Sequence, residues 1–168
     1  MKHLKTFEDK TSELNSELSK ETSSSISGVS DIIIKQEEKT NETYGFIKQY
    51  LDVIDFDSYI NNNNLYQVVA RYGNSIIGIR IFRLNGGKIH LNYSAVMPEF
   101  RNKGLNKKMF NEIEKIGISN SVNVITSNVR ESNISSLKSL LGSGFQINKN
   151  YDLKYPDGEK KLPLFKRL

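Results

Sequence analysis

The chain has 168 residues, the size of one ordinary domain whose core is large enough to need no covalent staples. It has no cysteine and only two histidines, which excludes a disulfide scaffold, a thiolate metal site, a cysteine nucleophile and a multi-histidine metal cage. Residues 1–100 carry 11 Lys+Arg and 13 Asp+Glu (net −2), and residues 101–168 carry 13 and 6 (net +7). The basic part indicates either a solvated surface or an anionic partner, such as a phosphorylated cofactor, nucleic acid or an acidic membrane.

Residues 1–29 are polar and rich in serine, and we predict that they form an arm that is flexible or a short amphipathic helix. The helical alternative depends on a stripe of apolar residues, namely Leu4, Phe7, Leu14 and Leu18. We find neither the apolar segment of a secretory signal nor a run long enough to cross a membrane. We therefore expect a cytoplasmic protein without membrane contact, whose folded domain spans residues 30–168.

The hydrophobic pattern of this domain predicts alternating strands and helices. The elements expected first are a strand at 31–35, a helix at 42–54, a loop at 61–64 and strands at 66–72, 75–84 and 88–96. Those expected next are a helix at 103–118, a strand at 122–129, a helix capped by Asn133 and strands at 145–151 and 162–167. This order predicts an α+β domain around one mostly antiparallel sheet.

Residues 96–108 are the segment with the clearest chemical signal, because a strand ends there and a helix begins after a short loop. The first amides of a helix have no acceptors within it and favour an anion. Gly104 allows a ligand to approach the backbone closely. Positive charge surrounds this turn at Arg101, Lys103, Lys107 and Lys108. The segment is either a seat for a diphosphate or an ordinary connection with a lysine-rich exposed face.

The same segment resembles the acyl-CoA-binding motif of the GNAT superfamily of N-acyltransferases. The family pattern is Arg/Gln-x-x-Gly-x-Gly/Ala, and Arg101 and Gly104 match it after Val96 and Pro98. Asn106 replaces the small residue at the last position. A larger side chain there either crowds the pyrophosphate or turns aside and donates a hydrogen bond to it.

A second segment, at 133–145, resembles the family's pattern Asn-x-x-Ala-x-x-Leu-Tyr-x-x-x-Gly-Phe. Asn133, Gly144 and Phe145 match it, and Ser136 stands at the small position. Leu140 stands where many members carry a tyrosine that donates a proton to the departing CoA thiolate. Leucine has no proton to donate, but a thiolate can leave without one and be protonated by water.

The resemblance implies a GNAT fold with a twisted, mostly antiparallel sheet of six to seven strands flanked by helices. It also implies a splayed strand pair, 94–96 against 126–128, that admits the pantetheine arm. The residues that it assigns to acetyl-CoA are Ala95, Val96, Arg101, Asn102, Lys103, Gly104, Leu105, Asn106, Lys107, Asn133 and Ser136. No metal is expected.

His90 occupies the strand position where some family members carry a glutamate that acts as the base. An imidazole is a competent general base at neutral pH. The alternative is a half-buried strand histidine that only hydrogen-bonds a neighbour.

The function that the resemblance implies is N-acetyl transfer from acetyl-CoA to a primary amine of a small molecule or a protein, in a bacterial-type enzyme. The alternative is a GNAT-like module that binds CoA or a protein partner with little or no catalysis. Nucleic-acid binding is not expected, because aromatic and basic residues do not interleave. A homodimer is left open.

Overall fold

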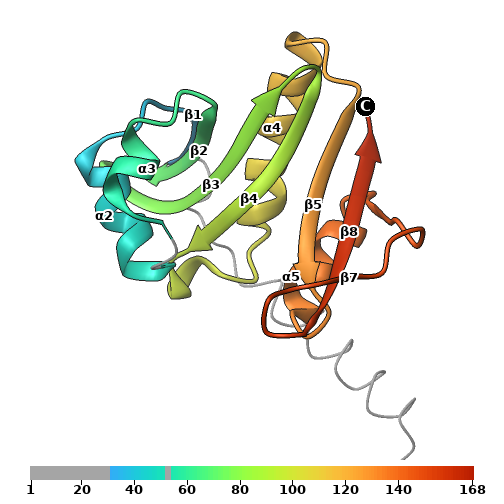
Figure 1. Cartoon of the computed structure of the whole chain (residues 1–168). Helices are drawn as coiled ribbons and strands as arrows, with labels where there is room; N and C mark the ends of the chain where they lie inside the picture. Colours follow the sequence, from blue (N-terminus) through green and yellow to red (C-terminus); the bar gives the residue numbers. More distant parts are fainter. Residues whose placement is uncertain (1–30, 52–53) are drawn as a thin grey trace, which may run out of the picture. The chain divides into compact units, whose positions relative to one another are not determined.

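One open sheet organises the part of the chain that the structure describes, residues 31–51 and 54–168 of a computed structural model. Its strands are β1 (Ile32–Gln36), β2 (Leu65–Tyr72), β3 (Ser75–Asn85), β4 (Lys88–Val96), β5 (Val124–Arg130), β6 (Gln146–Ile147), β7 (Leu153–Lys154) and β8 (Lys160–Arg167). The order across the sheet is β1-β2-β3-β4-β5-β8-β6, and β7 pairs with β8 (Figure 1). All pairs are antiparallel except β4 and β5.

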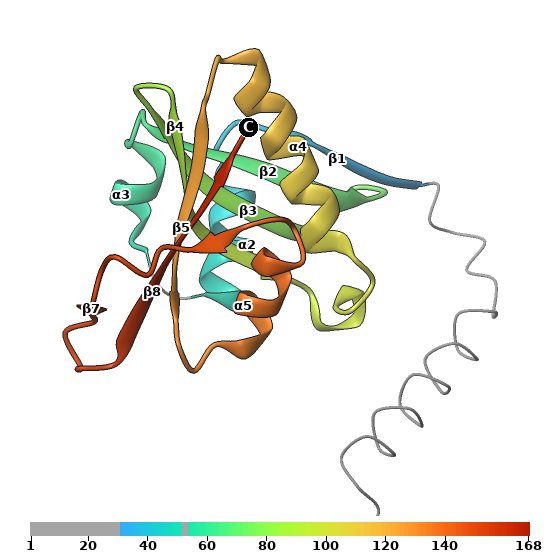
Figure 2. The same ribbon diagram turned by 90° about the vertical axis from the view of Figure 1, so that its right-hand side faces the viewer.

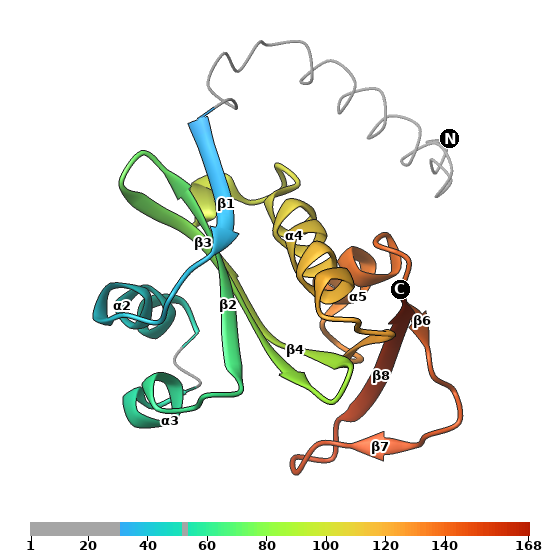
Figure 3. The ribbon, with the colours of Figure 1, turned by 90° about the horizontal axis from the view of Figure 1, so that it is seen from above.

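Helices lie on both faces of the sheet, and the central strand β3 is buried on both sides over most of its length. Figures 2 and 3 show α2 (Asn41–Tyr50) and α3 (Phe56–Ile60) on one face, and α4 (Leu105–Ser119) and α5 (Ile134–Leu141) on the other. A short 3₁₀ turn, η2 (Pro98–Phe100), lies between β4 and α4. The α+β architecture expected from the sequence is confirmed, as is its mostly antiparallel sheet.

The apolar stripe predicted for the helix at 103–118 forms the centre of the core on the α4 face. Met109 and Phe110 each precede Ile113 by about one helical turn, and all three are at most 1% exposed. They pack against buried residues of β2, β4 and β5 in one cluster. The α2 face has a separate cluster that includes Phe46, Ile47 and Tyr59.

A buried polar network attaches α2 and α3 to β2. Thr40 caps α2 in a reciprocal capping box with Thr43. The Thr43 hydroxyl hydrogen-bonds the Tyr59 hydroxyl at 2.8 Å, and Tyr59 donates to the side-chain oxygen of Gln67. Burial raises the pKa of Tyr59 to about 12, so the phenol remains a neutral donor. The network holds the two helices over the sheet.

Three expectations differ from the structure at element ends. The helix predicted at 42–54 ends at Tyr50, and α3 forms in a stretch predicted as connection, with Asp55 capping it by accepting from the Ser58 amide at 2.9 Å. Of the strand predicted at 145–151, only Gln146–Ile147 pair with β8. The earlier part of β8 pairs with β7 instead. Seven strands lie along the main path, and β7 is an eighth beside it. The predicted arm at 1–29 lies outside the described residues.

Candidate active site

The parallel strands β4 and β5 separate along their length, as Figure 1 shows toward the end of β4. Their pairing runs from Lys88 opposite Val124 to Leu91 opposite Ser127 and stops there. Asn92 is an extra residue in β4 relative to β3, which makes a bulge at the point of separation. The expected splay is present. Its register differs from the expectation, because Thr126 and Ser127 still pair with His90 and Leu91.

Two cavities lie along this opening and share several lining residues. The first has a volume of about 500 Å³ and lies beside the β4–α4 loop. The second, of about 510 Å³, lies between the separated strands. Both are lined by Leu51, Ser94, Asn106, Ser135 and Ser139. The result is one cleft that leads from the start of α4 to the gap between β4 and β5.

The β4–α4 loop reaches the helix through two residues in the left-handed region, Asn102 (φ 59°) and Gly104 (φ 74°). The amide of Lys108 donates to the Gly104 carbonyl at 3.1 Å, which is the first helical hydrogen bond of α4. The amides of residues 105–107 therefore precede the internal ladder and favour an anion. A Cβ at Gly104 would meet no atom within 4 Å, so the backbone here faces open space.

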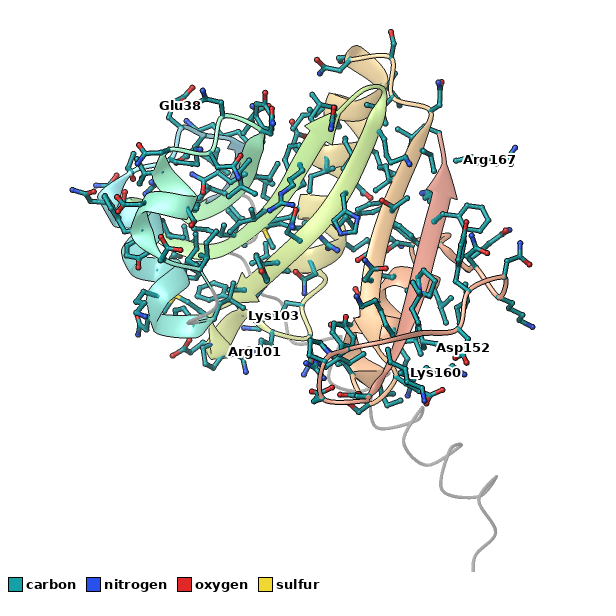
Figure 4. The ribbon with its side chains drawn as sticks, viewed as in Figure 1. Glu38, Arg101, Lys103, Asp152, Lys160 and Arg167 are labelled. Carbon is teal, nitrogen blue, oxygen red and sulfur yellow. The ribbon has the colours of Figure 1, made fainter. Side chains whose placement is uncertain are left out.

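Arg101 closes this loop onto the strand before it. Its Nε donates a hydrogen bond to the Val96 carbonyl at 3.0 Å. One N–H of the guanidinium therefore holds the loop against the end of β4. Figure 4 shows Arg101 and Lys103 together beside the end of β4. The Lys103 ammonium lies 5.6 Å from the centre of the Phe100 ring.

The structure brings ten of the twelve predicted site residues to the cleft. The first cavity is lined by Ala95, Val96, Arg101, Asn102, Gly104, Leu105, Asn106 and Lys107. Asn106 also lines the second cavity, together with Asn133 and Ser136. Lys103 and His90 line neither of the two.

Asn106 connects the two walls of the cleft. Its Oδ1 accepts a hydrogen bond from the Ser94 hydroxyl at 2.5 Å, so the side chain turns from α4 toward β4. The predicted hydrogen bond from Asn106 to the pyrophosphate stays a prediction. The bond crosses the place where the two cavities meet.

The α5 helix supplies the opposite wall. Asn133 caps it by accepting from the Ser136 amide at 3.1 Å, as predicted. Leu140, 4% exposed, is an apolar part of the second cavity.

His90 lies on β4 just before the strands separate. The Thr126 hydroxyl donates to the Ile89 carbonyl at 3.2 Å, so it accepts from Nδ1–H of His90 at 2.9 Å. This leaves Nε2 as the basic nitrogen of the neutral ring. Burial lowers the pKa of His90 below 6.5, and Arg83 and Lys88 lower this pKa further. The imidazole is therefore neutral at pH 7.

Sequence patterns missed a buried cation and a second approach to the cleft. Arg80 on β3 is 7% exposed and lines the second cavity. In the sequence, the one indication of this buried cation is an arginine within an otherwise apolar strand. A further cavity, of about 570 Å³, has Asp55, Asp57 and Arg83 in its wall and shares Tyr93 with the second cavity.

Comparison with known proteins decides the family. The model of the "Acetyltransferase (GNAT) family" matches residues 31–145. The chain belongs to the GNAT acetyltransferase family. No curated protein sequence matches it significantly. Within the described part of this GNAT domain, no helix is long and apolar enough to cross a membrane, and no group of three metal-ligating side chains occurs.

Solved GNAT structures show the same fold at low sequence identity. An IAA acetyltransferase from Bacillus cereus superposes with a TM-score of 0.70 at 16% identity, over 82% of this chain and 99% of the other. A Bacillus subtilis acetyltransferase in complex with CoA gives 0.65 at 19% identity, with the same coverage. The ribosomal-protein-S18-alanine N-acetyltransferase from Escherichia coli gives 0.65 at 18% identity, over 81% and 93% of the two chains.

Proposed function

We propose that this protein is an N-acetyltransferase that moves an acetyl group from acetyl-CoA directly to a primary amine. The observation that carries the proposal is the cleft from the first turn of α4 to the gap between β4 and β5. The helix amides suit a diphosphate, and the unpaired edges of the separated strands suit the amides of a pantetheine arm. Solved GNAT neighbours in complex with CoA or acetyl-CoA support this choice of co-substrate.

The amine would enter from the α3 face. The cavity there is lined by Asp55 and Asp57, whose carboxylates suit a cationic acceptor, and it meets the cleft at Tyr93. Similar folds include a ribosomal-protein alanine acetyltransferase and a putative streptothricin acetyltransferase, so the acceptor is either a protein or a small molecule.

Chemistry in this cleft depends chiefly on positioning two reactants. The amine nitrogen attacks the thioester carbonyl, the C–N bond forms, and the C–S bond breaks with its electron pair on sulfur. Leu140, in the wall of the second cavity, has no proton to give that sulfur. We propose that His90 is the base that takes the proton of the amine, through a water because it does not line the cleft.

The test is a calorimetric titration with acetyl-CoA, with desulfo-CoA for comparison, followed by a screen of amines for release of free thiol. Micromolar binding with amine-dependent thiol release is the expected result. Binding without release for any amine would favour the alternative, a GNAT-like module that binds CoA without transfer. No binding at millimolar concentration would exclude both.

The bond between Ser94 and Asn106 predicts an unusual effect of mutation. The bond crosses the cleft and must open or move aside for the pantetheine arm, so Asn106→Ala should tighten acetyl-CoA binding. A net hydrogen bond of about 1 kcal/mol corresponds to roughly fivefold in Kd. Calorimetry measures this change. Ser94→Ala removes the same bond and should give the same gain; weaker binding in both variants would contradict the prediction.

The role of His90 predicts a pH profile. Because the pKa of His90 is lowered from 6.5, kcat/KM should rise with pH through a value below 6.5 and level off by about pH 7. His90→Gln keeps a donor for Thr126 but has no basic nitrogen. It should lower kcat/KM about 100-fold at pH 7 and remove the rise of kcat/KM with pH. If the variant kept this rise, His90 would not be the base and would only hydrogen-bond Thr126.

A further inference from the structure

Arg80 is a buried cation without a counter-ion among the described residues. It lies in the middle of β3 and is 7% exposed, and no carboxylate of residues 31–51 or 54–168 pairs with it. Its Nη1 has a long hydrogen bond to the Asn106 carbonyl at 3.4 Å, and its Nε is buried with no hydrogen-bond partner among these residues. The Phe110 ring, 5.5 Å away, supplies only a cation–π contact.

Burying a charged group with an unpaired hydrogen-bond donor costs free energy of folding. Proteins keep such a group where an anion pairs with it. Burial lowers the pKa of Arg80 to about 10, which still leaves a cation at pH 7. A neutral residue would fit this apolar face more stably. The cost indicates that the guanidinium meets an anion other than the carboxylates of the described residues.

The anion must arrive through the second cavity, because Arg80 is part of its wall. The ionisable side chains that line this cavity are Arg80, Tyr93, Arg130 and Tyr155. Arg130 is already neutralised by Asp157 at 2.6 Å and Glu159 at 2.7 Å. Arg80 is therefore the one of the two lining cations whose charge is unbalanced by the described carboxylates.

We propose that Arg80 is a catalytic residue that stabilises the CoA thiolate as it leaves, an inference that depends on the proposed function. Attack of the amine forms the C–N bond, and collapse of the tetrahedral intermediate breaks the C–S bond with its electron pair on sulfur. The amine's proton goes to the base and then to water, while Arg80 keeps all its protons. The balance is acetyl-CoA plus neutral amine giving amide, thiolate and one proton. A thiolate in a cavity walled by Leu140 has Arg80 as its counter-ion.

The pKa of the bound CoA thiol tests this directly. A free thiol has a pKa of about 8.5, and a nearby cation lowers it. We would measure Kd for CoA and for desulfo-CoA from about pH 6 to 9.5; effects on the shared nucleotide and pantetheine cancel in the ratio of the two. In the wild-type protein, the ratio of the Kd for desulfo-CoA to the Kd for CoA should grow by about tenfold or more from the lowest to the highest pH. Such growth corresponds to a pKa of the bound CoA thiol that is lower than that of the free thiol by about one unit or more.

Arg80→Gln should abolish that growth while desulfo-CoA still binds, and kcat should fall about 100-fold. Arg167→Gln removes an exposed arginine at the end of β8, outside the cleft, and should behave like the wild type. Unfolding curves confirm that the variants fold. The wild-type titration needs no variant, so the proposal remains testable if Arg80→Gln does not fold.

Four results would overturn the proposal. A constant CoA to desulfo-CoA ratio in the wild type would show that no cation meets the sulfur. If kcat fell as far in Tyr155→Phe as in Arg80→Gln, Tyr155 would be the group that donates a proton to the leaving sulfur. Arg80-dependent preference for succinyl-CoA would show that the guanidinium serves a carboxylate on the acyl group. If neither CoA nor desulfo-CoA binds, the proposed function itself fails and the thiolate site with it.

Discussion

Replacing Gly104 with valine should lower the affinity for acetyl-CoA by about 100-fold or more, which is about 2.7 kcal/mol of binding free energy. Gly104 has φ 74° at the start of α4, and a Cβ there would meet no protein atom within 4 Å. A side chain would therefore project into the space above the helix amides. It would exclude the diphosphate and strain the left-handed backbone that aims those amides. Calorimetry with acetyl-CoA measures the loss.

A matched control separates this block from general strain. Gly73, in the turn between β2 and β3, also has positive φ (56°) and open space at its Cβ, but it lies outside both cavities. Gly73→Val should cost similar stability and leave acetyl-CoA affinity unchanged. Equal affinity of Gly104→Val and the wild type would remove the β4–α4 loop from the binding site.

The largest effect on stability is expected for Phe110→Ala. Phe110 is 1% exposed on α4, its ring centre is 5.3 Å from that of Phe145, and the Arg80 guanidinium lies over its face. The substitution leaves a cavity between α4, α5 and the sheet, and should lower the free energy of unfolding by about 3–5 kcal/mol. That is a large part of the stability of an ordinary domain. Denaturant unfolding followed by circular dichroism measures it.

Ile118→Ala on the same helix is the control, because this isoleucine is 67% exposed. It should change the free energy of unfolding by no more than about 0.5 kcal/mol. A Phe110→Ala variant as stable as Ile118→Ala would mean that the core on the α4 face is not packed as the structure shows.

Local patterns in the sequence predicted the parts of the fold that neighbouring residues determine. Met109, Phe110 and Ile113 recur at helical spacing, so the buried face of α4 follows from the helix period. Asn133 caps α5, as the sequence predicts. The sequence did not predict α3. Aspartate is a common N-cap residue, so Asp55 could have indicated the start of this helix, but the helix has only five residues.

The candidate site was predicted where its residues lie close together in the chain. Arg101 and Gly104 belong to one loop, and the motif spacing placed eight of the predicted residues around one cavity. His90 was placed by counting along one strand. Since the count ignores the bulge at Asn92 and the register of β5, it could not show that His90 stays outside the cleft.

The sequence by itself thus determined most of the order of elements, the strand–loop–helix connection at 96–108 and the family. Only the tertiary structure decided where β4 and β5 separate, that Asn106 turns toward Ser94, and that Arg80 enters the cleft. These contacts join residues 12 to 36 positions apart, as in the Ser94–Asn106 and His90–Thr126 bonds. Helix periods and caps depend on neighbours in the chain, whereas strand register and buried charge depend on which distant side chains share one space.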